Sequence, residues 1–141
     1  MRDSDLYFEL QQFYAQQMQS LDSGDAAAFA ATFTPDGVFI HYPDNKVHGR
    51  ESIRSATQEG IDRNRDTGVV RRHWFGLLDL QRQDDGSVHT SYSAYTTAVD
   101  ASGAVRIGPT CLVEDILVPD GEGGFLNHTR AIRRDDHELA R

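Results

Sequence analysis

The stretch Ser20-Leu21-Asp22-Ser23-Gly24-Asp25-Ala26-Ala27-Ala28-Phe29 joins the end of one predicted helix to the beginning of another. Gly24 can adopt the left-handed conformation that ends a helix, and the Asp25 side chain can cap the next one. Upstream, apolar residues recur every three or four positions, which is the spacing of one helix face: Leu6, Leu10, Phe13, Tyr14, Met18 and Leu21. The sequence therefore predicts a first helix that begins near Leu6 and a second from Ala26 to about Phe33.

The rest of the chain is predicted to contain a short hairpin, a third helix and four long strands. Thr34-Pro35-Asp36-Gly37 is a run of turn formers that stops the second helix. Residues 38–42 and 46–48 are predicted to form the hairpin, and a third helix follows from residue 49 to about residue 65. Turn residues then separate four β-rich stretches, at 69–83, 87–100, 105–118 and 125–134.

This order of elements predicts an α+β fold in one domain. Helices that precede a run of antiparallel strands pack together on one face of the sheet. Long strands that curl over helices leave a concavity, where ligand pockets are commonly found. We therefore expect a cone-shaped barrel, with three N-terminal helices packed on a strongly curved, mainly antiparallel sheet that encloses a pocket. A chain of 141 residues fits a single domain (1–141), with an ordered core at about 5–134 and a charged tail at 135–141.

Composition excludes several classes of partner. The 14 basic and 22 acidic residues give a net charge of −8, which repels nucleic acid and anionic membranes. The sequence contains no apolar run long enough to span a bilayer, and its N-terminus does not have the layout of a signal peptide. We expect a cytoplasmic protein whose partner is a small-molecule substrate.

Metal and cofactor sites are not predicted. The single Cys111 cannot form an internal disulfide or a cysteine-based zinc site, and it fits a small apolar position in a strand. His41 and His48 flank the short hairpin without the spacing of a known metal motif. Neither a nucleophile elbow nor a phosphate-binding or dinucleotide-binding glycine loop is present. We expect chemistry that needs no cofactor.

Asp22 and His73 are the first candidates for chemistry. Asp22 follows Met18 by one turn, near the C-terminal end of the first helix, where the helix dipole disfavours negative charge. It is either solvated or held inward by a cation-forming partner. His73 lies in an apolar strand, on the same face as Phe75 and Leu77 by alternation. It is either a hydrogen-bonded core histidine or a base.

Aromatic residues are the candidates for substrate binding. Tyrosines at such positions are core or wall residues by default, but one that reaches the pocket could hold a carbonyl oxygen or a water. The residues expected to contact substrate are Tyr14, Phe75, Tyr92 and Trp74, whereas Tyr42 is a candidate for catalysis.

Several segments together resemble the SnoaL-like polyketide cyclases and dehydratases of the nuclear-transport-factor-2-like superfamily. The resemblance covers essentially the whole chain and is carried by residues 20–29, Phe33-Thr34-Pro35-Asp36-Gly37-Val38-Phe39, Val47-His48-Gly49-Arg50-Glu51-Ser52-Ile53, Arg72-His73-Trp74-Phe75 and Val113-Glu114-Asp115-Ile116-Leu117-Val118. It implies the cone-shaped fold, a cofactor-independent enzyme and a homodimer formed through the open faces of the sheets.

The scytalone dehydratases of this superfamily supply roles for three matching positions. The resemblance implies that Asp22 orients His73, that His73 removes a proton next to a carbonyl, and that Tyr42 stabilises the enolate oxygen. Leu21 stands where those enzymes have a second tyrosine, and the strand around residues 95–98 offers no second histidine. The resemblance therefore implies a different substrate or a simpler reaction.

The expected function is that of a cofactor-independent cyclase or dehydratase, a lyase or isomerase. It would act on a small aromatic or polyketide-type carbonyl compound in secondary metabolism, such as antibiotic biosynthesis. Two alternatives stay open because fold alone does not fix function. One is a non-catalytic ligand-binding module or the small partner subunit of a ring-hydroxylating dioxygenase, and the other is an enzyme similar to the steroid isomerases.

Overall fold

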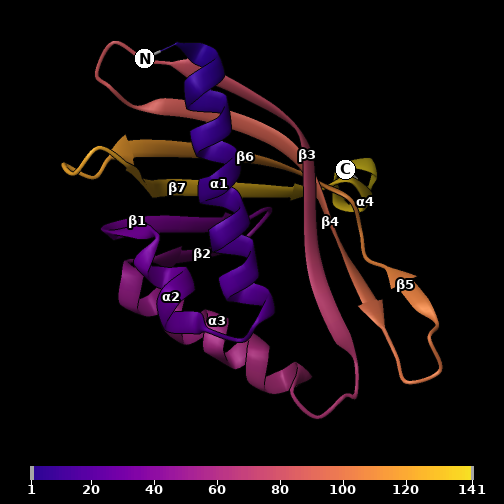
Figure 1. Cartoon of the computed structure of the whole chain (residues 1–141). Helices are drawn as coiled ribbons and strands as arrows, with labels where there is room; N and C mark the ends of the chain where they lie inside the picture. Colours follow the sequence, from indigo (N-terminus) through magenta and orange to yellow (C-terminus); the bar gives the residue numbers. More distant parts are fainter. Residues whose placement is uncertain (1, 141) are drawn as a thin grey trace.

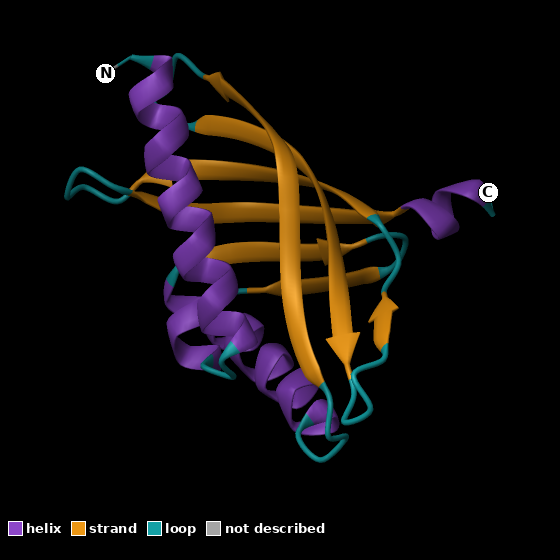
Figure 2. Cartoon of the chain, turned by 45° about the vertical axis from the view of Figure 1, so that its right-hand side comes forward, coloured by secondary structure: helices purple, strands orange, loops and turns teal. Residues whose placement is uncertain are grey.

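A computed structural model of the chain describes residues 2–140 and shows helices gathered on one side of a strongly curved sheet (Figures 1 and 2). The long helix α1 (Asp3–Asp22) lies across the sheet, while α2 (Ala26–Ala31) and α3 (Arg50–Asn64) lie together near one end of it. A short helix, α4 (Asp135–Leu139), follows the last strand. The region expected to be a charged tail therefore begins with a helical turn. Of the helices within residues 2–140, none is both long and apolar enough to cross a membrane.

The strands form one mixed sheet: β1 (Phe33–His41), β2 (Asn45–His48), β3 (Val70–Arg82), β4 (Val88–Val99), β5 (Val105–Ile107), β6 (Cys111–Pro119) and β7 (Phe125–Arg134). Their order is β2-β1-β7-β6-β4-β3, and β5 pairs with β4. The pairing of β1 with β7 is parallel, and the other pairings are antiparallel. Since the ordering begins at β2 and ends at β3, the sheet is curved but not closed. The predicted α+β fold is confirmed, with an open sheet in place of a barrel.

Two predicted boundaries are wrong. The second helix ends at Ala31, and β1 already begins at Phe33. The run of turn formers at 34–37 lies inside this strand. It forms an irregular segment there, where the register with β7 shifts between Phe33 and Val38. The stretch 105–118 is two strands, separated by residues 108–110. Pro109 lies in this gap, where it has no backbone N–H to donate to a neighbouring strand.

A bulge in β3 reverses the expected alternation. The register between β3 and β4 shifts between Gly76 and Asp79, so two residues of β3 oppose one residue of β4. At this point Leu77 has a positive φ of 58° and is 88 % exposed. The prediction that Leu77 shares a face with His73 is therefore wrong, and Leu78 packs against the core in its place.

Two apolar clusters hold the helices to the sheet. The first joins one face of α1 to β4 and β6 through Leu6, Leu10, Tyr14, Val88, Tyr92, Val113 and Leu117. The second joins α2, α3 and the start of β1 through Phe29, Ala30, Phe33 and Ile53. The predicted stripe of α1 is thus the stripe that packs, as its spacing requires. Between the clusters the sheet and helices leave space for a cavity.

Candidate active site

A cavity of about 830 Å³ opens between the helices and the concave face of the sheet. Its wall contains residues of α1, α2, α3 and strands β1, β2, β3, β4, β6 and β7. Apolar side chains form part of the lining, among them Met18, Phe29, Phe39, Ile53, Val113 and Ile132. Polar groups also reach it, including Asp22, His41, His73 and Arg130. A largely apolar wall with a few polar groups is typical of small-molecule sites.

Asp22 and His73 form a hydrogen-bonded pair at this wall. Oδ1 of Asp22 lies 2.6 Å from Nδ1 of His73, and the side chains are 14 % and 35 % exposed respectively. Both oxygens of Asp22 also accept the backbone N–H of His73, at 3.1 Å. The carboxylate therefore fixes the ring and the strand that carries it. This is the physical reason why an acid at the end of α1 faces inward.

The pairing assigns a tautomer to His73. Because an ionised carboxylate only accepts hydrogen bonds, Nδ1 of His73 donates its proton to Asp22. In the neutral form of the ring, Nε2 then carries the lone pair. No hydrogen bond to Nε2 is formed by residues 2–140. A neutral imidazole in this state is able to take a proton from a ligand in the cavity.

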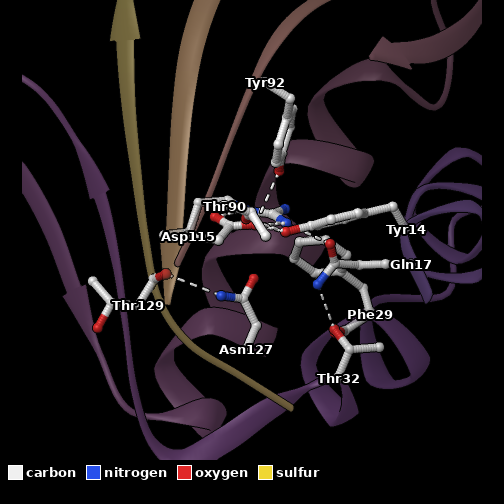
Figure 3. Close-up of polar contacts among 10 residues, drawn as sticks. Tyr14, Gln17, Phe29, Thr32, Thr90, Tyr92, Asp115, Asn127 and Thr129 are labelled. Carbon is white, nitrogen blue, oxygen red and sulfur yellow. Dashed lines mark hydrogen bonds and ion pairs between the residues drawn. The ribbon is translucent and has the colours of Figure 1, made fainter. Parts of the chain in front are cut away.

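A buried polar network lies beside the apolar cluster, between α1 and strands β4, β6 and β7 (Figure 3). The hydroxyl of Tyr14 donates to Oδ2 of Asp115 at 2.8 Å and lies 2.6 Å from the hydroxyl of Thr90. Tyr92 donates to the same carboxylate oxygen at 3.1 Å. Burial first, and the Asp115 charge second, raises the pKa of Tyr14 well above its usual range. Burial also raises the pKa of Tyr92.

Arg130 completes this network. Its Nε and Nη2 donate to the two oxygens of Asp115, at 3.0 and 2.9 Å, and Nη2 also donates to Oε1 of Gln17. The side chains of Arg130 and Asp115 are 3 % and 0 % exposed. Burial alone would lower the pKa of Arg130, but the Asp115 carboxylate raises it above its ordinary value, so the guanidinium stays charged.

A family model described as a SnoaL-like domain matches residues 2–130. The chain belongs to the SnoaL-like family. The resemblance noted in the sequence is thereby confirmed for the family. No curated protein matches the chain.

Three solved structures are similar to this SnoaL-like chain over nearly its whole length. Aln2 from a Streptomyces species is 39 % identical with a TM-score of 0.90, over 97 % of this chain and 96 % of that one. ActVI-ORFA from Streptomyces coelicolor is 37 % identical with a TM-score of 0.87, over 94 % and 96 %. A protein from Catenulispora acidiphila, solved in complex with S-DNPA, is 33 % identical with a TM-score of 0.84, over 98 % and 99 %.

Two of the three predicted catalytic residues of this SnoaL-like chain lie at the cavity, and the third does not. The structure brings Asp22 and His73 together, but Tyr42 is not among the residues that line the cavity. The ring of Tyr42 lies instead under the guanidinium of Arg133, with the guanidinium carbon 3.7 Å from the ring centroid. The prediction that Tyr42 lies in the pocket is therefore wrong, because this stacking holds its ring away from the cavity.

Two of the four predicted substrate-binding residues line the cavity, and the other two do not. Tyr92 and Trp74 line the cavity, and the Trp74 indole donates to Thr97 at 2.9 Å. Tyr14 and Phe75 do not line it. Their rings pack together in the apolar cluster, with centroids 5.3 Å apart. Both are corrected to core residues, since the hydroxyl of Tyr14 is already used by the buried network.

Sequence reasoning missed Asp115 and Arg130. Asp115 could have been recognised from the alternation of side chains along its strand. It lies two residues from Val113 and from Leu117, so it should share their buried face. A charged residue at an inward position needs a buried partner. Arg130 lies directly opposite Asp115 on β7. Within residues 2–140 no three His, Cys, Asp or Glu side chains gather in a way that could hold a metal ion.

Proposed function

We propose that the chain is a cofactor-independent cyclase or dehydratase of secondary metabolism, acting on a small aromatic or polyketide-type carbonyl compound. The observation that carries the proposal is the Asp22–His73 pair, 2.6 Å apart at the wall of a cavity of about 830 Å³. Membership of the SnoaL-like family supports it. The complex of the Catenulispora acidiphila protein with S-DNPA supports a ligand-binding cavity in this group.

In the proposed mechanism His73 acts as general base. Nε2 of His73 accepts an acidic proton from the carbon next to the substrate carbonyl, which leaves an enolate. The Asp22 carboxylate keeps the proton on Nδ1 and stabilises the imidazolium that forms. From this enolate, loss of water, ring closure and isomerisation are all accessible. His73 then returns the proton to the leaving hydroxyl, to the new alkoxide or to another carbon.

We also infer a location and an assembly state for the enzyme from its composition and its resemblance to the family. We place it in the cytoplasm, as a homodimer that works without a second kind of chain. A steroid-isomerase-like reaction would use the same proton abstraction and differs only in where the proton returns.

Steady-state kinetics with His73→Ala test the proposal. With bicyclic aromatic β-hydroxy ketones as substrates, kcat should fall by about 10²- to 10⁴-fold, which is the usual contribution of a general base. Ligand affinity should stay close to that of the wild type, because the residue acts in the transition state. His89→Ala is the matched control, since His89 is exposed on β4 and is not among the residues that line the cavity. Undiminished turnover by His73→Ala would rule out this mechanism, and binding without turnover by the wild type would favour the ligand-binding module.

A further inference from the structure

Arg130 lies in a row of residues that crosses four strands on the concave face of the sheet. Phe39 of β1 is its register partner on one side and Asp115 of β6 on the other, and Asp115 is in turn opposite Thr90 of β4. The guanidinium also lies 5.7–6.0 Å from the centroids of four aromatic rings, those of Tyr14, Phe33, Phe39 and Tyr92. Arg130 is therefore a charged group enclosed by rings and by one carboxylate.

One nitrogen of this guanidinium is not used by the protein. The five N–H groups of arginine are divided among Nε, Nη1 and Nη2. Nε and Nη2 donate to Asp115 and Gln17, whereas no hydrogen bond from Nη1 is accepted within residues 2–140. Arg130 nevertheless lines the cavity, with a side chain only 3 % exposed. Nη1 is not one of the fully buried polar atoms without a partner among residues 2–140, so its N–H groups stay accessible and are suited to a ligand oxygen.

Its partners hold the guanidinium in place before any ligand arrives. Asp115 accepts four hydrogen bonds, from Nε and Nη2 of Arg130 and from the hydroxyls of Tyr14 and Tyr92. The amide nitrogen of Gln17 in turn donates to the hydroxyl of Thr32 at 2.8 Å. This bond fixes the amide whose oxygen accepts the hydrogen bond from Nη2. Donors fixed in this way stabilise developing negative charge with little reorganisation, and they do so more strongly where water is excluded.

We propose that Nη1 of Arg130 binds the carbonyl oxygen of the substrate and stabilises the negative charge that this oxygen gains. The inference rests on the proposed function, and it assigns to Arg130 the role expected of Tyr42. It also defines a ligand class. The cavity selects ketones and phenols, whose oxygen becomes an enolate or phenolate, over molecules of equal size without such an oxygen.

The ionisation of bound 2-naphthol tests this inference without turnover. Its absorbance distinguishes the neutral from the anionic form, so titration at several pH values gives the affinity of each. In the His73→Ala variant, where the base is absent, the anion should bind about tenfold or more tightly than neutral naphthol, which lowers the pKa of the bound ligand by about one unit. Equal affinity for the two forms in this variant would overturn the inference.

Substitution of Arg130 locates the effect. Arg130→Met should abolish the preference for the anion, and Arg133→Met should keep it, because Arg133 lies on the same strand but not at the cavity. A folded Arg130→Met that still prefers the anion would overturn the assignment. If Arg130→Met does not fold, the titration in His73→Ala still decides whether the cavity stabilises an oxyanion.

The two proposals fail in distinguishable ways. Equal binding of the two naphthol forms, together with loss of turnover in His73→Ala, would leave the proposed function in place and remove the role of Arg130. Preference for the anion, with normal turnover by His73→Ala, would support Arg130 and contradict the dyad.

Discussion

Asp115 and Arg130 place two charges inside a small protein, at a cost that their hydrogen bonds must offset. Removing one member of such a buried pair typically costs about 3–5 kcal/mol, because the other charge is left without a partner. Here the carboxylate has four donors, two of them tyrosine hydroxyls whose own ionisation is suppressed. The network therefore ties stability to the protonation of Tyr14 and Tyr92.

Alkaline pH should destabilise the fold through these two tyrosines. Their pKa values are raised in the folded state above the usual 10.0, so the stabilisation is fully present below about pH 10 and is lost as the pH rises beyond it. The free energy of unfolding, measured in urea between about pH 8 and pH 11, should be flat at first and then fall. Tyr14→Phe should cost about 1–3 kcal/mol at neutral pH and weaken the alkaline decline.

Tyr7→Phe is the control for that series. Tyr7 is 37 % exposed and lies outside the network, so the alkaline decline should persist in this variant. Stability that stays constant up to about pH 11 would contradict the account of the buried hydroxyls.

At the level of single residues, the sequence predicts the pair of Asp22 and His73 but not the groups around it. Asp22 was recognisable because an acid at the C-terminal end of a helix is unfavourable, and His73 because apolar residues follow it along the strand. The pocket position of Tyr42 was wrong, since the stacking on Arg133 is not visible in local sequence. The role of Arg130 could not be predicted without the strand order, because its partner Asp115 lies on a neighbouring strand.

At the scale of elements, the bulge in β3 stores backbone strain at Leu77. Leu77 is the only non-glycine residue within residues 2–140 with a positive φ, and its side chain contributes little burial at 88 % exposure. Leu77→Gly should therefore raise the free energy of unfolding by about 1 kcal/mol, because glycine adopts this conformation without steric cost. Thermal or urea unfolding measures the change.

Ser93→Gly provides the contrast for Leu77→Gly. Ser93 is exposed on β4, pairs with Gly76 beside the bulge and has a negative φ, so glycine should cost about 0.5–1 kcal/mol there. A loss of stability in Leu77→Gly as large as that in Ser93→Gly would mean that the positive φ carries no strain.

Local pattern predicted most elements, and distant pairing explains the errors. The three- and four-residue spacing located α1, and the turn residues located the breaks between β3 and β4, between β4 and β5, and between β6 and β7. The turn formers at 34–37 lie inside β1 because β1 pairs in parallel with β7, which comes much later in the chain. Such a partner overrides local turn propensity and cannot be seen in a window of neighbouring residues.

At the scale of the whole molecule, the outer face of the sheet should form a homodimer. Large apolar side chains are exposed on β3 to β6, among them Val70, Tyr95, Val105, Ile107 and Leu112, at 39–65 % exposure. Exposed apolar groups gathered in this way are typical of protein interfaces. Sedimentation velocity should give about twice the chain mass of 15.8 kDa.

Leu112→Arg should shift this dimer towards monomer, because a charge would be buried at the interface. Leu139→Arg, at an exposed site on α4, should leave the dimer intact. A wild-type protein that sediments as a monomer would contradict the proposed dimer.

Hydrogen–deuterium exchange at carbon reports proton abstraction by His73 itself. Loss of water, ring closure and isomerisation all begin with this step, so the exchange does not depend on which of them follows. NMR of 1-tetralone in D₂O should show that the wild-type protein and His89→Ala accelerate exchange of the α-protons. We expect His73→Ala to reduce this acceleration by about 10²-fold or more. Exchange at the wild-type rate in His73→Ala, with the ketone still bound, would contradict proton abstraction by His73.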